Sequence, residues 1–109
     1  AEAVLNVIQS AAFIKGPDVK SLESEMAEYL NAKDVITCGN GTDALTISLM
    51  ALGIKKDDIV IVPSFTYIAT AEAAAILGLK PVMCDVDPDT FNVTAEFIEP
   101  LLSIFLLFF

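Results

Sequence analysis

Apolar residues recur at helical spacing through the first thirty positions of the chain. Between residues 2 and 14 they line one face, which predicts an amphipathic helix. The segment Lys15-Gly16-Pro17 interrupts this pattern. Because proline suits the first turn of a helix, a second helix is expected from Pro17 to Leu30. Four acidic residues, Asp18, Glu23, Glu25 and Glu28, point away from this apolar face, so the helix is expected to lie on the surface.

From residue 35 onward, short apolar runs alternate with helical segments. The runs predict strands at Val35–Cys38, Ile59–Val62 and Pro81–Cys84, and the segments between them predict helices at Thr42–Leu52 and Ile68–Leu77. Strands that are apolar on both faces and alternate with helices indicate an α/β fold. Its sheet is expected to be mostly parallel and covered on both sides, as a three-layer α/β/α arrangement. The carboxyl ends of such strands share one edge, where ligands bind.

The first loop at this edge is Gly39-Asn40-Gly41-Thr42-Asp43-Ala44. Glycine lets the backbone approach a ligand closely, and free amides at a helix start favour an anion, so a phosphate group is the expected occupant. A dinucleotide site also needs an acid after the second strand, where Pro63 and Ser64 stand instead. A nucleoside-triphosphate loop needs a lysine after its last glycine, and none follows Gly41. A plain glycine turn with Thr42 as N-cap stays open as the alternative.

The other two loops offer an aromatic residue and a group of acids. Tyr67 follows the second predicted strand, and it either stacks on a flat cofactor or packs against the protein. The acids of Asp85–Thr90 either bind a divalent metal or form a turn with local side-chain to backbone hydrogen bonds. The turn is favoured, because Asp-Pro-Asp-Thr is a typical turn sequence.

Composition narrows the classes of function. Six lysines, no arginine and fifteen acids give a net charge of −9, which repels phosphate backbones and argues against nucleic-acid binding. Histidine, the commonest general base and metal ligand, is absent. The apolar segment 101–109 is shorter than the roughly 20 residues that a membrane helix needs. We therefore expect a cytoplasmic protein that neither spans a membrane nor binds a metal.

Several short motifs follow one another at characteristic separations. They are Gly16–Val19 with Leu22-Glu23, Gly41–Leu45, Ala51–Ile54, Val62–Glu72 and Asp85–Asn92. In this order they resemble the DegT/DnrJ/EryC1/StrS family of sugar aminotransferases, over about residues 4 to 99.

The resemblance implies the large domain of fold-type-I transferases that depend on pyridoxal 5'-phosphate. Residues 1–99 would form its N-terminal part. By this resemblance the protein is expected to work as a homodimer in polysaccharide biosynthesis and to move an amino group, usually taken from glutamate or glutamine, to a nucleotide-linked keto sugar. Matched by motif, Gly41, Thr42 and Asp43 look like the segment that binds the cofactor phosphate, and Tyr67 looks like the aromatic that stacks on the pyridine ring. Asn40 and Thr66 border that site.

The resemblance places the catalytic groups outside this sequence. The Schiff-base lysine and the aspartate that pairs with the pyridine nitrogen are expected beyond residue 109, and none of the six lysines matches the lysine position. No catalytic residue is therefore assigned, and the chain alone is expected to be inactive and poorly soluble. Two alternatives stay open, a sugar dehydratase of the same family and a stand-alone module that binds a phosphate or nucleotide.

Residues 100–109 depart from the family pattern. Where the family continues a helix, this chain has Pro100 followed by an almost wholly apolar tail. A proline inside that helix removes one backbone hydrogen bond, at a cost of about 3 kcal/mol.

Overall fold

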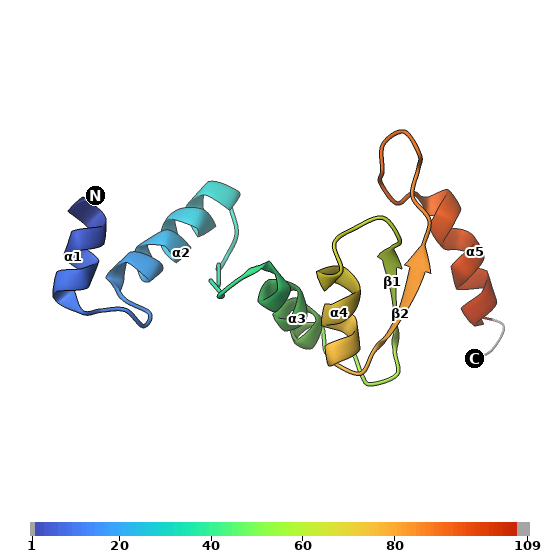
Figure 1. Ribbon diagram of the computed structural model, residues 1–109, viewed down its shortest axis with the longest axis horizontal. Coiled ribbons are helices and arrows are strands. Elements are labelled where there is room, and N and C mark those ends of the chain that lie inside the picture. The colour runs from blue at the N-terminus through green and yellow to red at the C-terminus, as the bar shows by residue number, and fades with distance from the viewer. Residues whose placement is uncertain (1, 107–109) are drawn as a thin grey trace. The chain divides into compact units, whose positions relative to one another are not determined.

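The computed structural model describes residues 2–106 and divides into two compact units, the first ending at Cys38 and the second beginning at Gly39. Its elements follow one another along the chain (Figure 1). They are α1 (Glu2–Ser10), α2 (Pro17–Leu30), α3 (Gly41–Ala51), β1 (Ile59–Pro63), α4 (Ala69–Ile76), β2 (Lys80–Cys84) and α5 (Ala95–Leu106). Two of the three predicted strands and all the predicted helices are present, with ends no more than four residues from those expected.

The first unit contains α1 and α2. Helix α1 ends at Ser10, four residues earlier than predicted, because Ala11 adopts a left-handed conformation with φ of 52° and turns the backbone out of the helix. Helix α2 begins at Pro17 as predicted. It ends at Leu30, and the C-cap Asn31 has a left-handed backbone (φ 49°) with its amide donating to the carbonyls of Ala27 and Glu28.

The second unit is built around a pair of parallel strands. Strand β1 pairs with β2 in a register that sets Ile59 opposite Lys80 and Pro63 opposite Cys84. Helix α4 connects the two strands and packs against both, while α5 packs against β2. Figure 1 shows α4 on one side of the strand pair and α5 on the other. The predicted α/β fold with parallel strands and helices on both sides is confirmed.

The prediction of a strand at Val35–Cys38 is wrong for this structure. The segment has no regular secondary structure and belongs to no ladder, and the sheet within residues 2–106 has two strands in the order β1-β2. The amide of Thr37 instead donates to the carboxylate of Glu23 at 2.9 Å. A β-branched run favours extended backbone, but it becomes a strand only when a neighbouring strand supplies hydrogen-bond partners.

The buried core lies in the second unit, between α4 and the strands. Its side chains are mostly small, so the helix approaches the sheet closely. The buried apolar residues are Val62, Ala69, Ala73, Ala74, Leu79 and Cys84. Glycines follow the ends of both α3 and α4, because Gly53 and Gly78 have φ of 69° and 73°, a conformation that costs glycine no steric strain.

Helix α5 continues through Pro100 to Leu106. The missing amide of Pro100 would otherwise have donated to the carbonyl of Glu96, and both residues are exposed. Residues 107–109 of the predicted apolar tail lie outside the described part of the chain. Among the described residues, no helix has the length and the apolar character needed to cross a bilayer.

Candidate cofactor-binding site

Helix α3 begins with a pair of reciprocal hydrogen bonds between Asn40 and Asp43. The side-chain carbonyl of Asn40 accepts from the Asp43 amide at 2.9 Å, and its Nδ2 donates to Asp43 Oδ2 at 3.0 Å. Asn40 is therefore the N-cap, with an extended backbone (φ −164°, ψ 174°). The alternative that made Thr42 the N-cap is wrong. Thr42 lies inside the first turn, where its carbonyl accepts from the Thr46 hydroxyl at 3.0 Å.

This cap leaves the first two amides of α3 without an acceptor. The first backbone bond of the helix runs from the Ala44 amide to the Asn40 carbonyl at 3.1 Å. Within residues 2–106 no carbonyl or side chain accepts from the amides of Gly41 and Thr42. A Cβ added to Gly41 would meet no atom within 4 Å. These two amides lie beside open space at the positive end of a helix dipole, an arrangement that can bind an anion.

The loop after β1 is hydrogen-bonded at its first residue, Ser64, and carries the exposed Tyr67 three residues later. The Ser64 amide donates to the Cys84 carbonyl at 2.8 Å, and the Ser64 hydroxyl donates to Asp85 Oδ1 at 3.3 Å. The hydroxyls of Thr66 and Thr70 lie 3.5 Å apart. Tyr67 is 77% exposed, so within the described residues its ring is available to a ligand. Its carbonyl accepts from the Thr70 amide at 3.2 Å, and α4 starts directly afterwards.

The packing of α3 against α4 connects the glycine-rich loop before α3 with the loop that carries Tyr67. Helix α3 packs against α4, which begins two residues after Tyr67. Figure 1 shows both helices running roughly opposite to the strands, so their N-termini lie toward the edge where β1 and β2 end. This is the edge at which the sequence predicted a ligand site, and α/β folds of this type bind ligands there.

The loop after β2 is a turn organised by Asp87. Its Oδ1 accepts from the Asp89 amide, the Thr90 amide and the Thr90 hydroxyl at 3.1, 2.7 and 2.9 Å. These donors, chiefly the Thr90 amide, hold the pKa of Asp87 below its usual value. The predicted turn with side-chain to backbone hydrogen bonds is confirmed. Within residues 2–106 no three acidic or cysteine side chains are grouped as a metal ion would require.

An aromatic contact that the sequence did not reveal joins the second and third loops. The rings of Phe65 and Phe91 lie 5.1 Å apart between centroids, with their planes tilted by 32°. Both side chains are more than half exposed. The only indication in the sequence was that each phenylalanine occupies a loop, which is an unusual place for a large apolar side chain.

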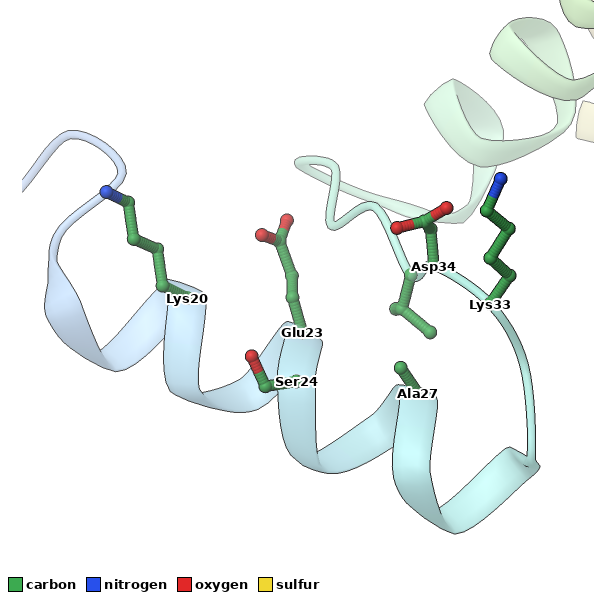
Figure 2. Close-up of a pocket in the computed structure, with 7 residues that line it drawn as sticks. Lys20, Glu23, Ser24, Ala27, Lys33 and Asp34 are labelled. Carbon is green, nitrogen blue, oxygen red and sulfur yellow. The ribbon is translucent and has the colours of Figure 1, made fainter.

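The first unit holds a separate polar cavity of about 360 Å³ beside α2. Figure 2 shows Lys20, Glu23, Ser24 and Ala27 along one stretch of α2, with Lys33 and Asp34 on the segment that follows the helix. Glu23 Oε1 accepts from both the amide and the hydroxyl of Thr37, at 2.9 and 2.8 Å. These two bonds lower the pKa of Glu23. Two lysines and two acids line the cavity, so its charges balance and favour neither an anion nor a cation.

Comparison with known proteins places the chain in a family. The sequence model of the DegT/DnrJ/EryC1/StrS aminotransferase family matches residues 1–103. The chain belongs to this family. A UDP-2-acetamido-2-deoxy-3-oxo-D-glucuronate aminotransferase of Pseudomonas aeruginosa is 46% identical over 100 residues, which cover 92% of this chain and 28% of that protein. A GDP-perosamine synthase of Caulobacter vibrioides is 44% identical over 88 residues, covering 81% of the chain and 24% of that protein.

Solved structures of family members have the same backbone arrangement. A DegT/DnrJ/EryC1/StrS aminotransferase from Brucella abortus superposes with a TM-score of 0.90 at 43% identity, over 96% of this chain and 28% of that one. The NtdA protein of Bacillus subtilis, solved with bound pyridoxamine phosphate (PMP), has a TM-score of 0.86 at 33% identity, over 91% and 23% of the two chains. The chain thus spans about a quarter of the length of the family members it matches, as a partial α/β domain of the fold-type-I class.

Proposed function

We propose that the protein containing this chain is a pyridoxal-phosphate-dependent aminotransferase that acts on a nucleotide-linked keto sugar, with glutamate as amino donor. This chain would supply the part of the large domain that holds the cofactor phosphate and one face of its ring. The observation that carries the proposal is the open start of α3, where the Gly41 and Thr42 amides lack acceptors among the described residues and Gly41 faces open space. A family match over residues 1–103 supports the same assignment.

The residues present fit a phosphate ester attached to an aromatic ring. The Gly41 and Thr42 amides would donate to the phosphate, and the Thr42 hydroxyl would add a third donor. Asp43 would contribute indirectly, because its carboxylate accepts a hydrogen bond from the Asn40 side chain and so holds the cap beside the phosphate in place. The exposed ring of Tyr67 would cover the heterocycle, with Thr66 beside it.

Pyridoxal phosphate, when bound, supplies an electron sink that stabilises negative charge developing on the carbon next to the amino nitrogen. The task of this chain is therefore to bind and orient rather than to transfer a proton. The phosphate donors would fix the position of the cofactor, and Tyr67 would fix the tilt of its ring. None of the chain's lysines matches the position of the family's Schiff-base lysine, so we assign no catalytic residue within it.

The names of the relatives support a sugar nucleotide as the acceptor. One relative is named for a UDP-linked keto sugar acid and another for a GDP-linked amino sugar. The two relatives differ in the nucleotide base, so we propose the substrate class without choosing the base. By the same family relationship we propose that the whole protein is a homodimer and works in the cytoplasm.

The test uses the protein expressed from its complete reading frame. Titration with pyridoxal phosphate should produce a near-visible absorption band, and glutamate with a UDP- or GDP-linked keto sugar should yield the amino sugar by mass spectrometry. Failure to bind the cofactor would overturn the proposal.

The Thr42 hydroxyl offers a sharper version of this test. Thr42→Val should weaken cofactor binding about tenfold, because a hydrogen bond to a charged group contributes about 1.5 kcal/mol or more. Thr94→Val is the matched control, since the buried Thr94 hydroxyl has no hydrogen-bond partner within residues 2–106. Equal affinities in the two variants would remove Thr42 from the phosphate site.

A further inference from the structure

We propose that Phe91 is a positioning residue that braces the loop carrying Tyr67, and that Asp87 holds Phe91 in the conformation this requires. The inference rests on the proposed function, because it gives the braced loop the task of presenting Tyr67 to the cofactor. It concerns a segment, Asp87–Asn92, that within residues 2–106 forms no hydrogen bond or ring contact with the phosphate donors or with Tyr67.

Phe91 has a backbone conformation that only its surroundings can maintain. Its φ is 59°, in the left-handed region that a bulky side chain rarely adopts. Two backbone bonds close the turn around it. The Phe91 amide donates to the Asp87 carbonyl at 2.8 Å, and the Asp87 amide donates to the Asn92 carbonyl at 2.9 Å. The Asp87 carboxylate fixes the intervening residues through its bonds to Asp89 and Thr90.

This conformation sets the Phe91 ring against Phe65. The centroid separation of 5.1 Å lies within the range of favourable aromatic pairs. Phe91 is 57% exposed and Phe65 is 65% exposed, so the contact adds little to the buried core. A strained residue that forms a surface contact between two ligand-edge loops is more easily explained by loop placement than by stability.

The loop after β1 is therefore held at successive residues from the β2 side. Ser64 is bonded to Cys84 and Asp85, and Phe65 is held by the Phe91 ring. Tyr67 follows Phe65 by two residues, and its carbonyl accepts from the Thr70 amide at the start of α4. Among the contacts within residues 2–106, loss of the Phe65–Phe91 contact would leave the loop anchored at Ser64 and at the start of α4. The exposed Tyr67 ring would then sample more orientations.

The experiment compares three substitutions of Phe91 in the protein expressed from its complete reading frame. Phe91→Ala removes the ring and keeps the strain, Phe91→Gly removes both, and Phe91→Tyr keeps the ring. Hydrogen exchange without cofactor is followed at the amides of Ser64 and Thr70, which donate to Cys84 and Tyr67. Affinity for pyridoxal phosphate and the melting temperature are measured on the same samples.

Bracing predicts that both Phe91→Ala and Phe91→Gly speed exchange at these amides and weaken cofactor binding, each by about two- to tenfold, the range for loss of one aromatic pair. Phe91→Tyr should stay near the wild type. Phe91→Gly should melt no lower than Phe91→Ala, because glycine tolerates positive φ. A merely structural role predicts instead that exchange and affinity recover in Phe91→Gly along with stability. That recovery, or unchanged exchange in both variants, would overturn the proposal.

Asp87→Ala and Asp89→Ala form a matched pair in the same turn. Both remove one carboxylate, but within residues 2–106 the Asp87 carboxylate accepts three hydrogen bonds and the Asp89 carboxylate accepts none. Asp87→Ala should resemble Phe91→Ala and Asp89→Ala should resemble the wild type, whereas equal effects would contradict the role of Asp87. A wild-type protein that binds no pyridoxal phosphate refutes the proposed function alone, because exchange without cofactor still tests the bracing.

Discussion

Asn40 and Asp43 each donate one hydrogen bond to the other across the first turn of α3, at 3.0 and 2.9 Å. Because the Asn40 side chain accepts from the Asp43 amide, the helix-start amides that lack an acceptor within residues 2–106 are those of Gly41 and Thr42. The cap and the candidate phosphate site are thus complementary parts of one helix terminus.

Asn40→Ala should destabilise α3 by about 1 kcal/mol, because it removes the N-cap acceptor. Asn40→Ser should recover most of this loss, since serine is also a good N-cap. Urea unfolding of the protein expressed from its complete reading frame measures both, with Asn6→Ala on the exposed face of α1 as control. Equal stabilities of Asn40→Ala and the Asn6 control would show that the cap contributes nothing.

Gly41→Ala should separate stability from cofactor binding. The added methyl group meets no atom within 4 Å and replaces a poor helix former, so α3 should gain up to about 1 kcal/mol. Cofactor affinity should fall, because the methyl group enters the open space where the phosphate would approach.

The matched control for Gly41 is Gly53→Ala. Gly53 has φ of 69°, so alanine there should cost about 1 kcal/mol without changing cofactor affinity. Thermal melting and fluorescence titration with pyridoxal phosphate measure the two effects. Unchanged cofactor affinity in Gly41→Ala would place the phosphate elsewhere.

Tyr67→Ala should weaken cofactor binding severalfold while changing stability by less than about 0.5 kcal/mol, as expected for an exposed side chain. Tyr67→Phe should bind almost as the wild type does, because stacking needs the ring and not the hydroxyl. Tyr29→Ala is the control, since Tyr29 is 83% exposed on α2, in the other unit. If Tyr67→Ala binds the cofactor normally, the stacking role is wrong.

Glu23 should make the stability of the first unit depend on pH in the acid range. Its pKa is lowered from the ordinary value of 4.5, first by the Thr37 amide and then by the Thr37 hydroxyl. A lowered folded-state pKa means that the carboxylate contributes its full stabilisation above pH 4.5 and loses it as the pH falls through the folded value.

Glu23→Gln should therefore flatten the decline in stability below pH 4.5. Hydrogen exchange at the Thr37 amide reports on this bond directly, since that amide donates to Glu23. Glu28→Gln, on the same helix, removes the same charge without touching Thr37 and should keep the wild-type profile. A parallel profile in the two variants would show that the bond is not the cause.

Local sequence was sufficient for most element boundaries. Pro17 marks the start of α2, and Gly53 and Gly78 mark the ends of α3 and α4, because proline and glycine restrict or free the backbone at their own positions. The apolar runs also predicted β1 and β2, which the structure pairs in parallel. For Val35–Cys38, local propensity favoured a strand, but within the described residues no neighbouring strand pairs with this segment.

The candidate site was predicted in part for the same reason. The glycine-rich loop and Tyr67 were identifiable because both lie directly after predicted strands, where a parallel sheet presents its ligand edge. Asn40 as the cap was missed, since a threonine and an asparagine in the same turn are both good N-caps and only the backbone geometry distinguishes them.

By itself the sequence determined the order of helices and strands, the family and the loops that carry the candidate site. Tertiary structure alone decided that Glu23 binds Thr37, fourteen residues away, and that Phe65 meets Phe91, because such contacts depend on how distant segments pack. Propensity and turn chemistry act over a few neighbouring residues, so they fix local conformation. The pairing of remote side chains follows from the chain's path through space, which no local pattern specifies.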